Sequence, residues 1–292
     1  MLNQGARAEI AADSVSDILK TVTIPPCPAV VAVLLNESRK AQVDFLKIIR
    51  LISSDLGLAA SMMKTANSPI FALRNKVQSI QQAATVLGLK NVINIVNGLA
   101  LQRALTPKGV NMERFWDRSN YHALVSSRLA KHVPGLSIED AYTFGLFHDC
   151  GIPILMQRFP EYKNTLSLAN LSSRPTCEVE NERHGTDHVA VGTMLARNWQ
   201  LPPLLVQAIR LHHDFDILRE ASADIPGQAR ALTAISTLAD HLISRFLNAA
   251  DEAEWMAYGA SCLNYLGFDE AEVEELYCEI SEEVGSIDAD RR

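Results

Sequence analysis

The chain of 292 residues lacks the patterns that mark several large classes of protein. Its five cysteines are odd in number and widely spaced, with no C-x-x-C pair, which indicates free thiols in a reducing compartment. No apolar run approaches the ~20 residues that a membrane-spanning helix needs. The N-terminus also lacks the charged and apolar regions of a secretion signal. We therefore expect a cytoplasmic protein with no membrane partner.

Basic residues do not gather into a stripe with interleaved aromatic residues, so a nucleic-acid partner is not expected. The formal net charge is -7, but 13 of the 34 acidic residues and only two of the 27 basic residues lie in residues 251–292. The remaining 250 residues are slightly basic and can accept an anionic ligand. A glycine-rich phosphate loop and a dinucleotide-binding fingerprint are also missing from the sequence.

The composition favours an all-α protein, because strand-forming residues are sparse while Ala, Leu, Glu and Lys are plentiful. A first helix is predicted over residues 11–22, and apolar residues recur at helical spacing after it. The clearest internal break is Thr106-Pro107-Lys108-Gly109. We therefore predict an N-terminal helical subdomain over residues 1–108, a second helical subdomain over residues 109–250, and acidic C-terminal helices over residues 251–292.

His148 and Asp149 stand side by side at the end of an apolar run in the second subdomain. Ser137 opens this run with a capping-box pattern, and the helix that follows is mostly apolar, so both side chains are expected to face the interior. A buried carboxylate needs hydrogen-bond donors or a cation. An imidazole beside a carboxylate suits a first-row divalent metal.

Three more inward-facing positions accompany this pair. His188 lies on the apolar face of a long helix predicted from Ser173 to Trp199, and His212-His213 close a helix that Pro203 opens. Asp240 lies on the flank of a very apolar helix. Each position alone has an ordinary explanation, such as a hydrogen-bonded core histidine. Four such positions on consecutive helices favour a shared metal site.

Together these motifs resemble the HDOD family, the HD-related output domains within the HD superfamily of metal-dependent phosphohydrolases. The resemblance covers about two thirds of the chain and rests on Ile24–Pro28, Leu51–Asp55, Ala66–Ser68, Ser79-Ile80, Leu87–Leu89, Phe115-Trp116, Gly145–Asp149, His188–Gly192 and Trp199–Pro202. It implies a multi-helix HD-like bundle with an N-terminal helical subdomain, used in bacterial signal transduction. Family members typically regulate or transmit a signal.

The resemblance also implies a ligand set for one or two divalent transition metals, Fe, Mn or Zn. The residues that match this set are His148, Asp149, His188, His212, His213 and Asp240. HD proteins begin the set with a His followed by Ser, but Arg118-Ser119 occupies that position here. His122 lies one turn later on the same face and is the candidate replacement, displaced by ~5–6 Å along the axis. Arg118 can instead bind a phosphate group or neutralise Asp149 directly.

Three functional hypotheses are open at this point. The first is a regulatory module that acts through a signalling protein partner, with a metal or nucleotide as structural ligand. The second is a metal-dependent phosphohydrolase for a phosphate-containing small molecule, with Asp149 and Arg118 in catalytic roles. The third is a metal-free fold in which the His and Asp side chains form only a polar network.

Two other activities are not expected. The cyclic-dinucleotide phosphodiesterases of the superfamily carry a Gly-Tyr-Pro signature shortly after the His-His pair, whereas residues 214–217 read Asp-Phe-Asp-Ile. A cysteine nucleophile has little support, because the neighbouring Asp149 raises the pKa of the Cys150 thiol.

Overall fold

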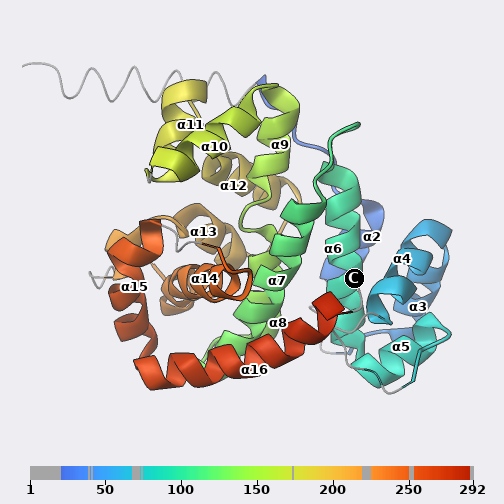
Figure 1. The fold of residues 1–292 in the computed structure, drawn as a ribbon. Coiled ribbons are helices and arrows are strands. Elements are labelled where there is room, and N and C mark those ends of the chain that lie inside the picture. Colours follow the sequence, from blue (N-terminus) through green and yellow to red (C-terminus); the bar gives the residue numbers. More distant parts are fainter. Residues whose placement is uncertain are drawn as a thin grey trace, which may run out of the picture.

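The computed structural model describes residues 21–38, 40, 42–67, 73, 75–172, 174–218, 225–249 and 253–289. Within these ranges every regular element is a helix, so the all-α prediction is confirmed. The helix predicted over residues 11–22 lies almost wholly outside the described residues. The elements, labelled in Figure 1, are α2 (Ala29–Ser38), α3 (Phe45–Ser53), α4 (Leu56–Ala66), α5 (Ile80–Leu87), α6 (Leu89–Leu105), α7 (Glu113–Leu129), η2 (Ala130–His132), α8 (Ile138–Phe147), α9 (Gly151–Arg158), α10 (Tyr162–Ser172), α11 (Thr176–His184), α12 (His188–Asn198), α13 (Pro203–Leu211), η3 (Phe215–Leu218), α14 (Gly227–Phe246), α15 (Ala253–Leu266) and α16 (Glu270–Ala289).

Short polar residues start several of these helices. Asp44, Asp55 and Ser79 each accept a hydrogen bond from a backbone N–H in the first turn of α3, α4 and α5. Ser137 does the same for α8, where its hydroxyl accepts from the N–H of Asp140. These bonds satisfy donors that have no partner inside the helix. The predicted capping pattern at Ser137 therefore marks the true start of α8.

Two apolar cores hold the helices together. The smaller core joins α3, α4 and α5 to the first half of α6, through residues such as Val92 and Val96. The larger core joins the second half of α6, including Leu101 and Leu105, to the helices from α7 onward. Because α6 belongs to both cores along its length, it connects the N-terminal helices to the rest of the chain. The division predicted at residue 108 stays a prediction.

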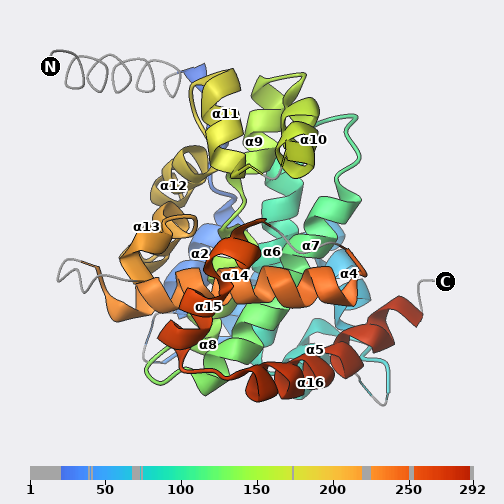
Figure 2. The same cartoon turned by 60° about the vertical axis from the view of Figure 1, so that its left-hand side comes forward.

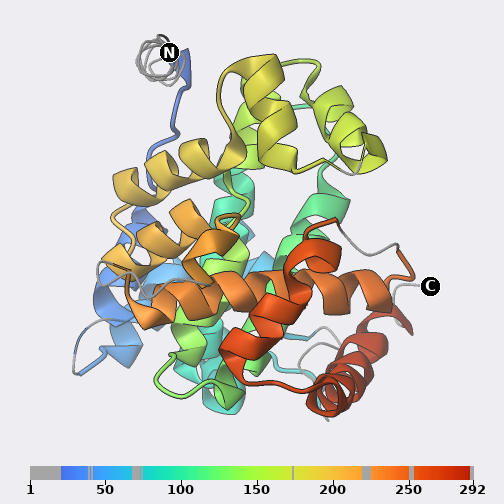
Figure 3. The same ribbon diagram turned by 90° about the vertical axis from the view of Figure 1, so that its left-hand side faces the viewer.

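The central layer of the larger body is made by α7, α8 and α14. Helices α7 and α8 pack along each other, and α14 packs against α7, α8, α13 and α15. Figure 2 shows α14 crossing the middle of the molecule with α15 and α16 outside it, and Figure 3 shows the same orange helix from the side. Among the described residues, no helix combines the length and the apolar character that crossing a membrane requires.

One predicted helix is wrong. The sequence pattern predicted a single helix from Ser173 to Trp199, but the structure has α11 and α12 with a sharp break between them. Gly185 ends α11 in the left-handed conformation, with φ of 66°, and Asp187 caps α12 by accepting from the N–H of Ala190. Glycine adopts this conformation without steric cost, and aspartate favours the N-cap. The break changes the direction of the chain immediately before His188.

Candidate metal centre

Five helices carry the predicted site residues to one region of the larger core. Arg118 and His122 lie on α7, and His148 and Asp149 directly follow α8. His188 is the first residue of α12, His212-His213 follow α13, and Asp240 lies on α14. The structure thus brings all of the predicted residues together, in two neighbouring groups. Helix ends supply most of them, because there the chain turns and can aim a side chain across the core.

The first group consists of Asp149, His188, His212 and His213. Each of these side chains offers one ligand atom such that all four atoms lie within 4.8 Å of one another. The Oδ1 atom of Asp149 lies 3.3 Å from Nε2 of His188 and 3.6 Å from Nε2 of His212. The Nε2 atoms of His188 and His213 are 3.1 Å apart. One carboxylate and three imidazoles therefore converge on a single small volume.

The outward nitrogen of each imidazole is fixed by an acceptor. Nδ1 of His212 donates to the carbonyl oxygen of Ile209 at 2.7 Å. Nδ1 of His188 donates to Glu180 at 2.7 Å, and Nδ1 of His213 donates to Glu254 at 2.8 Å. A neutral imidazole carries one proton, so each inward Nε2 presents a lone pair. This pattern, with Nδ1 held by an oxygen and Nε2 free to bind, is typical of metal-ligating histidines.

The convergence of these lone pairs with a carboxylate calls for a cation. Nε2 of His212 is buried and has no hydrogen-bond partner. Burial acts to lower the pKa of His188, but the Glu180 carboxylate outweighs it and holds the pKa well above its usual value, so Nε2 of His188 carries a proton unless a metal ion displaces it. Burial likewise acts to raise the pKa of Asp149, yet interactions with His148 and His212 keep it well below its usual range. The donor set fits a divalent transition metal of the Fe, Mn or Zn type.

The second group consists of His122, His148 and Asp240, whose ligand atoms also lie within 4.8 Å of one another. The rings of His122 and His148 stack with their centroids 3.9 Å apart. Nε2 of His148 lies 3.3 Å from Oδ2 of Asp149, so Asp149 adjoins both groups. The predicted replacement ligand, His122, is thus within reach of the other two residues.

Three contacts make this second group less open to an ion. Both ring nitrogens of His122 lie 3.2 Å from a serine hydroxyl, Ser126 at Nδ1 and Ser236 at Nε2. A guanidinium nitrogen of Arg118 lies 2.8 Å from Oδ1 of Asp240. Arg118 therefore forms an ion pair with Asp240, and its predicted roles toward a phosphate group or Asp149 stay predictions. The positive charge of Arg118 occupies one side of the carboxylate that a second metal would use.

Several residues of the site were not found from the sequence. Glu180 is fully buried and accepts from the hydroxyl of Tyr162 and from both the backbone N–H and Nδ1 of His188. Cys177, Glu180 and His188 form a further group with potential ligand atoms within 4.8 Å. Gly185 is the sequence feature that could have indicated the contact between Glu180 and His188. A glycine that ends the helix there lets the chain turn, so that α11 packs back against the start of α12. Glu254 comes from the acidic C-terminal region, and no local pattern indicates its contact with His213.

Cys150 follows Asp149 and is buried against α12. Its Sγ lies 3.8 Å from the carbonyl oxygen of Gly192. Burial raises the pKa of the Cys150 thiol far above its usual value, and the charge of Asp149 raises it further. The thiol is therefore protonated and packed in the core. Burial is thus the larger cause of the raised pKa, and the neighbouring Asp149, on which the sequence argument rested, is the smaller one.

Comparisons with known proteins show the family and the fold of this chain. The HDOD domain matches residues 24–215. An uncharacterized protein of Treponema pallidum (strain Nichols) is 24% identical over 193 residues, which are 65% of this chain and 38% of that protein. This chain therefore spans well under half the length of that relative.

Three solved structures share the fold. An HDOD domain protein of unknown function from Geobacter sulfurreducens aligns with a TM-score of 0.76 at 21% identity, over 97% of both chains. A proposed signal transduction protein of Marinobacter aquaeolei VT8 gives 0.74 at 24% identity, over 96% of this chain and 64% of that chain. A proposed phosphohydrolase of Shewanella amazonensis SB2B gives 0.72 at 21% identity, over 94% and 95%. At these identities the likeness shows the fold alone.

Proposed function

Because this chain belongs to the HDOD domain family, we propose that it is a regulatory module of bacterial signal transduction with one divalent metal ion bound in its HD-like core. The observation that carries the metal proposal is the convergence of Asp149, His188, His212 and His213, with Nε2 of His212 buried and unpartnered. A buried acceptor without a partner is costly, and a cation at this point would satisfy all four groups at once.

The proposed ligands are held in place by a second layer of residues. Glu180 and Glu254 orient His188 and His213, and the carbonyl of Ile209 orients His212. Such contacts fix the ring and strengthen the inward nitrogen as a ligand. When bound, a divalent ion supplies Lewis acidity toward an oxygen ligand and a charge of +2 in the core. In a regulatory module its main effect is to tie α8, α12 and α13 together.

The second residue group favours regulation over hydrolysis. A two-metal phosphohydrolase needs both groups open to ions, since the pair of metals stabilises the attacking and leaving oxygens. Here Arg118 pairs with Asp240, and both nitrogens of His122 lie against serine hydroxyls. The guanidinium of Arg118 thus already supplies a positive charge at the residue group that would hold a second metal ion. A signalling protein partner, rather than a turned-over substrate, is then the expected receiver of the output.

A metal-dependent phosphohydrolase is the second candidate, and one observation favours it. The side chain of Arg118 is 33% exposed and that of Asp149 is 26% exposed, so the site is reachable from solvent beside a guanidinium. Arg118 could bind two oxygens of a phosphate ester and neutralise charge that develops on them. In that case Arg118 would leave Asp240 when the phosphate-containing molecule binds.

The two candidates are separated by measuring metal content and hydrolysis on the same preparations. Wild-type protein purified without chelators is expected to contain close to one Fe, Mn or Zn ion per chain. The Asp149→Ala variant, purified in the same way, is expected to contain none. His132→Ala, which alters an exposed histidine outside the site, is the matched control and should keep the ion. The metal proposal fails if wild-type protein holds no transition metal and takes up none on titration with Mn²⁺ or Zn²⁺. Metal-dependent turnover of p-nitrophenyl phosphate that Arg118→Ala abolishes would favour the phosphohydrolase.

A further inference from the structure

A hollow of about 410 Å³ lies where α12 and α13 pack against each other. Figure 2 shows these two helices side by side. Arg197 in the last turn of α12 lines the hollow, and α13 lines it with Pro203, Val206, Gln207 and Arg210. The four residues of α13 recur at helical spacing and so form one stripe, ~10 Å long. The volume is within the range of small-molecule sites, so a compact ligand is indicated.

The two arginines of the hollow have no counter-ion in the part of the chain that the structure describes. Arg197 and Arg210 are both exposed, and neither forms a hydrogen bond or an ion pair with a described residue. The amide of Gln207 is likewise without a partner among these residues. The rest of the lining is apolar, so the hollow has two positive charges and no carboxylate. A concave surface with charges of one sign concentrates ions of the opposite sign.

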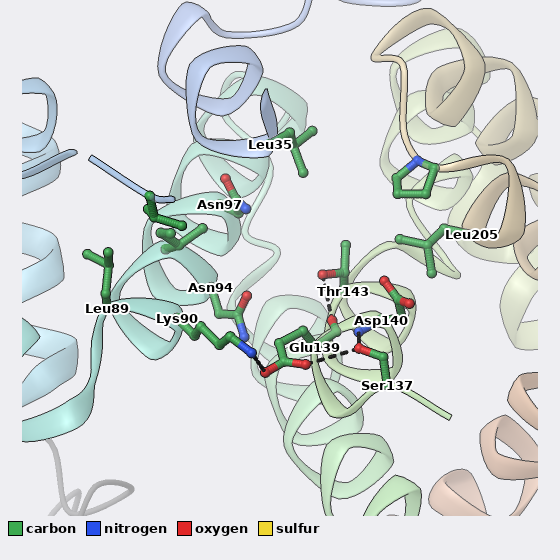
Figure 4. Close-up of a pocket in the computed structure, with 13 residues that line it drawn as sticks. Leu35, Leu89, Lys90, Asn94, Asn97, Ser137, Glu139, Asp140, Thr143 and Leu205 are labelled. Carbon is green, nitrogen blue, oxygen red and sulfur yellow. Dashed lines mark hydrogen bonds and ion pairs between the residues drawn. The ribbon is translucent and has the colours of Figure 1, made fainter. Parts of the chain in front are cut away.

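The pocket between α6, α8 and α13, drawn in Figure 4, differs from this hollow in its charges. The ammonium of Lys90 donates there to the carboxylate of Glu139 at 2.5 Å, and Asp140 adds a second acidic side chain to the lining. The positive charge of that pocket is thus already paired inside the chain. Of the two, the hollow between α12 and α13 is the one that calls for an anion.

Phosphate is the anion that matches these groups. A phosphate monoester carries nearly two negative charges at neutral pH on three terminal oxygens, whereas a carboxylate carries one charge on two oxygens. It can therefore neutralise two guanidinium groups and accept hydrogen bonds from both. Leu201, Pro203 and Val206 offer apolar surface to the rest of a ligand. We propose that this hollow binds a small phosphomonoester with an apolar or aromatic body, its phosphate held by Arg197 and Arg210.

The hollow and the metal centre lie on opposite sides of α13. Arg210 and His212 are two residues apart, which is ~200° around a helix, and Arg210 is exposed whereas His212 is buried. A ligand in the hollow contacts both α12, which His188 begins, and α13, which His212 follows. The binding proposal itself uses only the lining of the hollow and does not depend on a bound metal.

Adenosine monophosphate is a suitable probe, and adenosine is its neutral counterpart with the same aromatic body. Isothermal titration of the full chain is expected to show saturable binding of adenosine monophosphate, with adenosine at least about tenfold weaker. Arg197→Gln and Arg210→Gln each remove one charged donor and should each weaken adenosine monophosphate about tenfold. Both side chains are exposed, so neither change is expected to disturb folding.

Arg183→Gln is the matched control, since Arg183 is an exposed arginine of α11 outside the hollow. It should bind adenosine monophosphate as wild-type protein does. The proposal is overturned if wild-type protein does not bind the probe at about 5 mM, near the weak end of useful affinities, if adenosine binds equally well, or if neither hollow variant changes the affinity. A loss of affinity in Arg118→Gln alone would place the probe at the metal centre and overturn it too. A phosphoserine peptide that binds more tightly than adenosine monophosphate would overturn the assignment to a small molecule.

Discussion

Glu180 accepts a hydrogen bond from Nδ1 of His188 at 2.7 Å and a second from the backbone N–H of the same residue at 3.0 Å. One buried carboxylate therefore fixes both the start of α12 and the direction in which the His188 ring presents Nε2. The contact crosses the break between α11 and α12, so it exists only because the chain reverses at Gly185.

Glu180→Gln is predicted to weaken metal binding by ~10–100-fold, the usual cost of removing the carboxylate behind a histidine ligand. A glutamine keeps the volume but loses the charge that holds the proton on Nδ1. Competition titration with a chromophoric chelator and Zn²⁺ measures the change. Glu182→Gln is the matched control, because Glu182 is exposed on the same helix and pairs with Arg174, outside the metal centre. Equal affinities in the two variants would contradict the role of Glu180.

Gly151→Ala is predicted to destabilise the protein and to disturb the site. A Cβ atom at Gly151 would lie 2.0 Å from the carbonyl oxygen of His188 and 2.9 Å from the nitrogen of Gly192. Backbone atoms cannot yield as a side chain does, so α9 and α12 must separate. A cost of at least ~1–3 kcal/mol is expected, as for other overpacked cores.

The melting temperature, followed by circular dichroism, checks this prediction. Gly57→Ala is the control, since a Cβ there meets only Asp55 Oδ1 at an ordinary 3.5 Å. That change should be neutral or stabilising by ~0.5–1 kcal/mol, because alanine is the better helix former. If Gly151→Ala has the same melting temperature as the wild-type protein, the close approach of α9 and α12 is not required for stability.

The sequence indicated which His and Asp side chains face the interior, but it did not indicate the contacts that Glu180 and Arg118 make with them. Helical periodicity predicted that His148, Asp149 and His212 face the interior, because it fixes which face of a helix is buried. Glu180 escaped notice because one continuous helix would have placed it ~12 Å along the helix axis from His188. The pairing of Arg118 with Asp240 joins residues 122 apart in the sequence. Periodicity carries no information on such distant contacts.

Arg118→His is predicted to raise the number of metal ions per chain from one to two. The change removes the guanidinium from Asp240 and places an imidazole one turn before His122, beside the second residue group. Two ions need open ligands in both groups. Metal analysis after equilibration with excess Mn²⁺ and gel filtration gives the stoichiometry. Arg114→His, an exposed position one turn earlier on α7, should stay at one ion, and a value of one in both variants would contradict the account of Arg118.

Glu37 gives the N-terminal helices a pH-dependent contribution to stability. Hydrogen bonds from Lys40 and Lys47, at 2.8 and 2.9 Å, lower the pKa of the Glu37 carboxyl to about 2. The folded pKa lies below the ordinary value of 4.5, so folding is favoured by ionised Glu37. This stabilisation is complete above 4.5 and is lost as the pH falls from there toward 2.

Glu37→Gln should therefore lower the urea midpoint at pH 7, and the difference from wild-type protein should shrink at pH 4 and further at pH 3. Urea unfolding followed by circular dichroism at the three pH values measures this difference. Glu139→Gln is a useful comparison, because Glu139 forms a more exposed pair with Lys90 and such pairs contribute little. A difference that is constant from pH 7 to pH 3 would show that Glu37 acts through packing rather than charge.

Anomalous diffraction from crystals of the protein grown with Mn²⁺ or Zn²⁺ tests the central claim most directly. We predict one strong peak enclosed by Asp149 and the Nε2 atoms of His188, His212 and His213. No peak there, or a peak confined to the group of Cys177, Glu180 and His188, would contradict the assignment of the metal centre.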